Sequence, residues 1–133
     1  MNLYEAFEKT LVDEGKTFPL SAEASITLLP VGGDKARRKF EQMMEPYAPR
    51  LKAGGELTEQ ENKDLNIKFY AEHIILGWSG LRGKDKEPVP YSKEAAYTLL
   101  SDKKLERFFS LIIRMASDEA SFEEKRLEED EGN

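Results

Sequence analysis

Hydrophobic side chains recur at helical spacing over most of the sequence, which predicts a mainly helical protein. Near the N-terminus, Leu3, Phe7 and Leu11 recur every fourth residue and are followed by a glycine. This spacing predicts an amphipathic helix from Asn2 to Glu14, with the Asn2 side chain as its N-cap.

The residues after this helix have the composition of strands. Two short runs of β-prone and apolar residues, Thr17–Leu20 and Ser25–Leu29, are separated by four small or polar residues and followed by a proline and two glycines. They predict a small β-hairpin. Since Pro19 has no N–H to donate to a neighbouring strand, its strand should lie at the edge of the sheet.

Helical patterns with start and stop signals fill most of the remaining sequence. The predicted helices run from Asp34 to Glu45, from Thr58 to about Gly77, from Ser92 to Leu100 and from Lys103 to about Lys125, with Asp34, Thr58, Ser92 and Asp102 as the expected N-caps. The helix that starts at Thr58 is apolar on two faces, which predicts a central position between neighbours. A loop rich in glycine, proline and charge, Trp78–Tyr91, follows it.

The last predicted helix carries more apolar surface than packing on one side requires. One stripe consists of Leu105, Phe108, Phe109, Ile112 and Ala116. Leu111, Ile113 and Met115 widen the apolar arc to roughly 200°. Acidic residues dominate the sequence after Ser117, so residues 118–133 are predicted to fray into a solvated tail.

These elements together predict a single domain over residues 1–133, of the α+β class and mainly α. It should contain four to five helices and a small N-terminal β-hairpin. A chain of this length can bury about two-thirds of its unfolded surface, which is enough for a core without disulfides or metals.

The composition argues against catalytic and metal chemistry. The absence of cysteine excludes disulfides, thiolate zinc sites and a cysteine nucleophile, and the single histidine, His73, makes a His-based metal site or triad improbable. The carboxylate pairs lie at expected helix ends, where solvation accounts for them. We therefore expect no enzyme activity, no cofactor and no catalytic or metal-binding residue.

The formal net charge of −6 favours solubility and argues against a general nucleic-acid binder. No apolar run approaches the roughly 18 residues of a membrane span, and the N-terminus does not resemble a signal peptide. A cytoplasmic protein that does not bind membranes is therefore expected.

One concentration of positive charge stands against this acidic background. In the predicted basic helix Lys35–Lys39, the side chains of Arg37, Arg38 and Lys39 form a basic face. The face leaves open an alternative function, a small regulatory or nucleic-acid-binding protein. More often such a face is solvated, or meets an acidic partner such as the acidic tail of the same chain.

Trp78, Leu81 and Tyr91 frame the predicted loop and allow two interpretations. Either Trp78 packs in the core and the prolines fix the loop, or the aromatic residues anchor a partner. The apolar arc of the last helix likewise predicts contact with a second copy or with an amphipathic client helix. The candidate partner-binding residues are Trp78, Leu81, Tyr91, Leu105, Phe108, Ile112 and Met115.

The order of these features resembles that of a known family. Tyr70–Leu81, reading YAEHIILGWSGL, is followed by a charged loop, two prolines, a Tyr-Ser pair and a helix with an Ala-Leu-Leu pattern. Upstream, the sequences GKTFPL and ITLLP lead into the basic helix. Over roughly residues 15–115 the chain resembles the tail assembly chaperones of lambda-like long-tailed bacteriophages.

The resemblance implies a non-enzymatic protein that coats the tape measure protein while the tail tube assembles around it. Such a protein acts in the cytoplasm of the bacterial host and is not part of the mature virion. Many members also have a longer form, made by ribosomal frameshifting, whose extension recruits the tail tube protein. We also expect the chain to form homo-oligomers.

Overall fold

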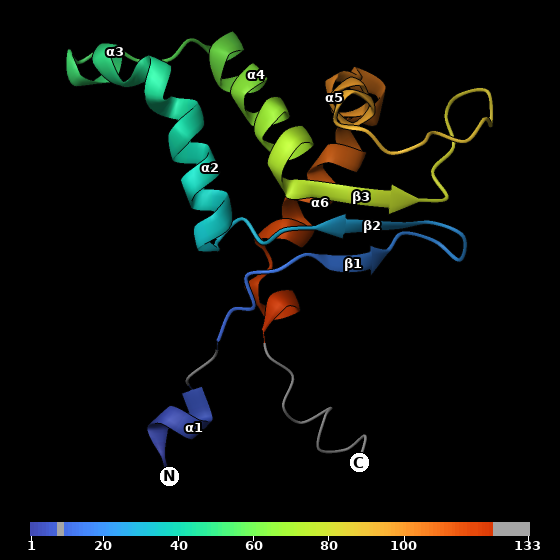
Figure 1. Ribbon diagram of the computed structural model, residues 1–133, viewed down its shortest axis with the longest axis horizontal. Helices are drawn as coiled ribbons and strands as arrows, with labels where there is room; N and C mark the ends of the chain where they lie inside the picture. Colours follow the sequence, from blue (N-terminus) through green and yellow to red (C-terminus); the bar gives the residue numbers. More distant parts are fainter. Residues whose placement is uncertain (8–9, 124–133) are drawn as a thin grey trace.

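A three-stranded antiparallel sheet lies at the centre of the computed structural model, which describes residues 1–7 and 10–123 (Figure 1). Strand β2 (Ser25–Leu28) lies between β1 (Lys16–Pro19) and β3 (Ile75–Ser79). The predicted hairpin of β1 and β2 is confirmed. β1 is an edge strand, as predicted from the proline at its end.

The third strand corrects the prediction of a central helix that reaches Gly77. Helix α4 (Glu59–Phe69) gives way to one π-helical turn, Tyr70–Ile74, and the chain then enters β3. The physical reason is that Ile75 and Trp78 pair with β2, so that this apolar run forms a strand in which Ile75 is buried. A continuous apolar run does not by its periodicity distinguish a buried strand from a helix.

A β-bulge in β3 exposes one large apolar side chain. Thr27 lies opposite Gly77 and Leu28 lies opposite Ile75, so Leu76 has no partner on β2. Ile75 is buried, whereas Leu76 is 44% exposed. The bulge therefore turns Leu76 away from the core, to the outer face of the sheet beside Thr27.

In the view of Figure 1, α2 (Asp34–Met44), α4 and α5 (Lys93–Ser101) lie on the β3 side of the sheet and α6 (Glu106–Ser117) crosses behind it, with α2 and α4 adjacent at one end. The predicted α+β, mainly helical class is confirmed. The other helices are α1 (Leu3–Phe7) and α3 (Ala48–Lys52), and 3₁₀ turns cover Glu45–Tyr47, Lys103–Leu105 and Glu119–Phe122.

Of the predicted N-caps, Thr58, Ser92 and Asp102 are confirmed, the last at the 3₁₀ turn that precedes α6, and Asp34 is wrong. At α4, Thr58 Oγ1 accepts the Glu61 N–H at 3.1 Å and Glu61 Oε1 accepts the Thr58 N–H at 3.0 Å, which is a complete capping box. The Ser92 side chain caps α5. At α2, Gly33 occupies the N-cap and Asp34 is the first helical residue.

The N-terminal helix is shorter than predicted, because α1 ends at Phe7 and not at Glu14. Its N-cap is confirmed, since Asn2 Oδ1 accepts a backbone N–H at 3.0 Å. Further along, the Val12 N–H donates to the carbonyl of Phe122 at 2.7 Å. Pairing with a distant segment therefore replaces the helical hydrogen bonds expected here.

The C-terminal helix is also shorter than predicted, because α6 ends at Ser117. Residues 118–123 pack against β1 and do not fray: Phe122 is 3% exposed and its ring centroid lies 5.6 Å from that of Phe18. Lys16 Nζ also donates to the carbonyl of Ser121 at 2.6 Å. The remainder of the predicted tail, residues 124–133, lies outside the described residues.

The core lies between the inner face of the sheet and the helices. Ile26 and Leu28 of β2, Ile74 before β3 and Ile112 of α6 are fully buried. The sheet and α6 therefore share one hydrophobic cluster, which fixes the orientation of the helices beside it.

Candidate functional site

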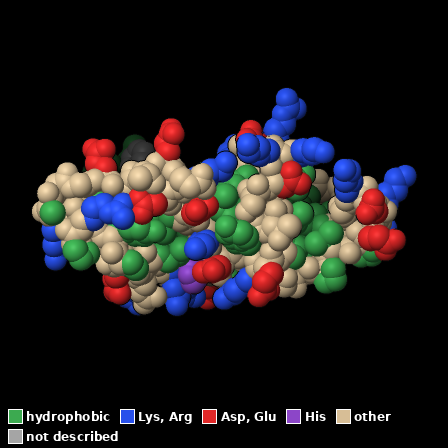
Figure 2. All heavy atoms as spheres, turned by 90° about the horizontal axis from the view of Figure 1, so that it is seen from above, with side chains coloured by type: hydrophobic (Ala, Val, Ile, Leu, Met, Phe, Trp, Pro, Cys, Tyr) green, Lys and Arg blue, Asp and Glu red, His purple; other side chains and the backbone are tan. Residues whose placement is uncertain are grey.

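A groove with an apolar floor lies between α4, α5 and α6 and encloses about 440 Å³. We call it the apolar groove. Its floor is formed by Ile67, Tyr70, Leu100, Phe109 and Ile113, and its rim by Lys63, Asn66, Ser101, Asp102, Lys103, Glu106 and Ser110. Apolar side chains reach the surface between charged ones in the space-filling view of the molecule (Figure 2).

Two aromatic rings meet in the floor of the apolar groove. The centroids of Tyr70 and Phe109 are 5.4 Å apart. Burial raises the pKa of the Tyr70 phenol, an effect that a hydrogen bond with Ser117 partly opposes. The phenol therefore stays neutral at physiological pH, and with Ile113 39% exposed the groove offers uncharged surface to a partner.

The predicted partner-binding residues of the last helix lie beside the groove and not in it. Ile112 is fully buried, and Leu105, Phe108 and Met115 are half-buried. The groove uses Phe109 and Ile113, each one residue further along than Phe108 and Ile112. Because each helical step turns about 100°, the sequence located the apolar arc of α6 without showing which part of it the core covers.

The other groove residues were not singled out from the sequence as binding residues. Ile67 and Tyr70 lie in one apolar stripe of the central helix, which the sequence predicts to be apolar on two faces, and Leu100 ends the apolar face of α5. That stripe was the signal in the sequence from which these two groove residues could have been identified. Its position beside α6 depends on how α4, α5 and α6 pack, which periodicity does not specify.

Trp78 and Tyr91 attach the loop between β3 and α5 to the sheet. The indole N–H of Trp78 donates to the carbonyl of Val89 at 2.7 Å, and the Tyr91 hydroxyl donates to the carbonyl of Ile75 at 3.0 Å. The two rings pack edge to face with centroids 5.1 Å apart. The structure therefore uses both aromatic residues to hold this loop.

The loop itself is organised by backbone hydrogen bonds. The Val89 N–H donates to the carbonyl of Leu81 at 2.9 Å, and Leu81 is half-buried. Gly80 has a φ of +74°, and a Cβ at this position would collide with the carbonyl of Glu23. These contacts surround a hollow of about 340 Å³ between the loop and the end of β3.

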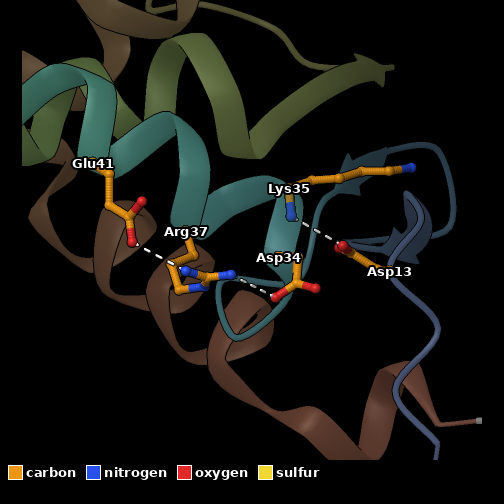
Figure 3. A network of polar contacts seen from close by, with 5 residues as sticks. All are labelled: Asp13, Asp34, Lys35, Arg37 and Glu41. Carbon is orange, nitrogen blue, oxygen red and sulfur yellow. Dashed lines mark hydrogen bonds and ion pairs between the residues drawn. The ribbon is translucent and has the colours of Figure 1, made fainter.

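The basic face of α2 is partly neutralised by its own helix. Arg37 donates to Asp34 Oδ1 at 3.0 Å and to Glu41 Oε1 at 3.1 Å (Figure 3). Both partners raise the pKa of the Arg37 guanidinium. At the start of the same helix, the Asp13 carboxylate accepts the Lys35 N–H at 3.0 Å, while the Lys35 side chain extends away from this cluster (Figure 3).

A second hollow, of about 750 Å³, lies between α2 and the outer face of the sheet. We call it the basic basin. Its cations are Lys35, Arg38 and Lys39, its apolar residues are Leu29 and Leu76, and it is completed by Glu14, Gly15, Gln42, Glu72 and His73. Burial lowers the pKa of His73, nearby Glu72 opposes this effect, and Lys39 and Lys93 add to it.

Within residues 1–7 and 10–123, no three histidine or acidic side chains gather as they would around a metal ion. The helices in the same part of the chain are all too short or too polar to cross a membrane.

Comparison with known proteins identifies the origin of the sequence. The model of one family, described as YdaY prophage protein, matches residues 31–133. The chain belongs to the YdaY prophage protein family. The predicted phage or prophage origin is thus confirmed, as a prophage protein, at the level of the family. Comparisons with curated proteins and with solved structures found no match.

The YdaY match includes every residue of the apolar groove, the loop after β3 and all of α2. It leaves out β1 and β2. The resemblance to tail assembly chaperones implies a more specific function than the family description gives. For this YdaY family member, that function stays a prediction.

Proposed function

We propose that this prophage protein is a tail assembly chaperone that binds a helical segment of a tape measure protein in the apolar groove. The observation that carries the proposal is the floor of the groove, to which three helices contribute uncharged side chains. An amphipathic helix presents an apolar stripe flanked by polar residues, so it is complementary to such a floor and its polar rim. The resemblance over residues 15–115 supports the choice of client.

The rim of the groove carries charges of both signs. Lys63 and Lys103 contribute cations, and Asp102 and Glu106 contribute anions. Charges at the rim of an interface contribute more to orientation and specificity than to affinity. A client helix with charges placed opposite these four side chains would therefore bind in one preferred direction.

The proposed role requires binding without catalysis. The chaperone would cover apolar surface of its client in the host cytoplasm and leave before the virion is complete. Because a tape measure protein is long, several copies would bind along it, which is the basis for proposing a homo-oligomeric coat. A longer frameshifted form would bring the tail tube protein to this coat.

The test is co-purification of the chain with fragments of the tape measure protein of the same prophage. Ile113→Asp places a charge in the groove, whereas Leu51→Asp places the same charge on α3, outside the groove. The two side chains are equally exposed, at 39%, so both variants should fold. We expect Ile113→Asp to weaken capture at least about tenfold and Leu51→Asp to leave it unchanged.

Two results would contradict the proposal. One is that no tape measure fragment is captured by the unaltered chain. The other is that Ile113→Asp and Leu51→Asp bind the client equally well, which would move the binding surface elsewhere. Ile112→Asp is unsuitable for this test because Ile112 is fully buried, and a charge there would unfold the protein.

A further inference from the structure

The basic basin combines an apolar floor with a row of cations on one side. Leu76, exposed by the bulge in β3, lies in the same hollow as Lys35 and Lys39. No acidic side chain of the described residues lies within ion-pair distance of Lys35, Arg38 or Lys39. The lining also includes Glu14 and Glu72, but the cations of α2 outnumber them. A complementary ligand would therefore carry an apolar side chain next to several carboxylates.

The last ten residues of the sequence have this composition. They read EKRLEEDEGN, in which Leu127 is followed directly by four acidic residues, Glu128 to Glu131. An apolar anchor beside consecutive carboxylates matches the arrangement of Leu76 beside the cations of α2.

The position of Glu123 favours a contact within one chain. Glu123 pairs with Leu11 in an isolated β-bridge, and the basin residue Gly15 is only four residues beyond Leu11. Four residues span at most about 14 Å, whereas the ten residues after Glu123 can span roughly 33–36 Å. The acidic segment is therefore long enough to reach the far side of the basin.

Tethering also reduces the affinity that the contact needs. Single exposed ion pairs are weak. A segment joined to its site by a short linker, however, has an effective concentration in the millimolar range. Several weak ion pairs and one apolar contact are then sufficient to hold the segment for much of the time.

We propose that residues 124–133 bind the basic basin of the same chain, with Leu127 against Leu76 and the acidic side chains facing Lys35, Arg38 and Lys39. This contact covers the cationic surface of α2 against anionic ligands. The contact does not involve the apolar groove, because the apolar groove and the basic basin share no residue. Its failure would therefore leave the proposed chaperone function untouched.

Zero-length carbodiimide crosslinking tests the proposal in the full chain, because it joins an ammonium group only to a carboxylate in contact with it. We expect crosslinks from Lys35 and Lys39 to residues 128–131 within one molecule, and their loss in about 1 M salt, where the Debye length is about 3 Å. Arg38→Glu should reduce their yield several-fold, whereas Arg107→Glu, the same change at another exposed arginine, should not.

His73 provides a second readout, since it is the only histidine and lines the basin. The charged groups near it are Glu72, Lys39 and Lys93. If the acidic residues 128–131 also lie near His73, replacing Glu128, Glu129 and Glu131 by Gln and Asp130 by Asn will lower the pKa of His73. This pKa is measured from the NMR signals of the imidazole.

Three outcomes would overturn the proposal. The first is crosslinking of the acidic residues to Lys63 and Lys103 as often as to Lys35 and Lys39. The second is a crosslink that joins isotopically labelled to unlabelled chains, which would place the segment on a second copy. The third is a pKa of His73 that does not change when the four acidic residues are neutralised.

Discussion

The apolar groove and the loop after β3 contain similar side chains but use them differently. In the loop, the polar ends of Trp78 and Tyr91 both donate to main-chain carbonyls, so these rings hold the fold. In the groove, the side chain of Ile113 has no polar end that could hold the fold in this way, and it is 39% exposed. An aromatic residue in a sequence therefore does not by itself indicate a binding surface, because the fold can already use its polar end.

The largest expected effect tests whether α6 has a core side and a groove side. Ile112 is fully buried and its neighbour Ile113 is 39% exposed, so the same substitution should have different consequences. Ile112→Ala should lower the free energy of unfolding by roughly 2–5 kcal/mol, because it leaves a cavity in the core. Ile113→Ala should change it by no more than about 0.5 kcal/mol.

Urea unfolding followed by circular dichroism measures both values. The distinction between the two sides of α6 would fail if the two variants lost equal stability. It would also fail if Ile113→Ala were the more damaging change, since the groove would then be part of the core.

The main elements could be predicted because their signals are local. The capping box at Thr58 and Glu61 and the hairpin of β1 and β2 need only neighbouring residues to be recognised. β3 could not be predicted because its apolar run also fits a helix, and only pairing with β2 decides between them. The same limit applies to Val12, whose N–H donates to the carbonyl of Phe122, 110 residues later in the sequence.

A smaller effect tests whether the loop is held by its aromatic residues. Tyr91→Phe removes the hydroxyl that donates to the carbonyl of Ile75 and should cost about 1 kcal/mol of stability. Tyr97→Phe is the matched control, because Tyr97 is exposed and its hydroxyl has no hydrogen-bond partner among the described residues. Equal urea midpoints for the two variants would show that the loop does not depend on this contact.

The candidate site was harder to predict than the fold. The sequence indicated that α6 has more apolar surface than one neighbour needs, and this surplus is what Phe109 and Ile113 provide to the groove. It could not indicate that Leu100 and Tyr70 would complete the floor, because they come from elements whose relative position is set by packing. A site formed by three helices has no continuous signal in the sequence.

The smallest expected effect concerns the start of α4. Hydrogen bonds from Arg50, and then from the backbone of Thr58, lower the pKa of Glu61 from 4.5 to about 2. The folded state therefore favours the ionised carboxylate, and this stabilisation is complete above about pH 4.5 and is lost as the pH falls towards 2. Glu61→Gln should remove this contribution at neutral pH. At pH 3 the variant should lose less stability relative to the unaltered chain.

Urea midpoints at pH 7 and pH 3 measure this difference, with Glu59→Gln as the control in the same helical turn. Because Arg50 and Glu61 are partly exposed, the effect should be modest and should shrink in high salt. If Glu61→Gln were equally destabilising at both pH values, the stabilisation by Glu61 would not depend on the ionisation of its carboxyl group. The loop after β3 would be unaffected in either case, because it makes none of these contacts.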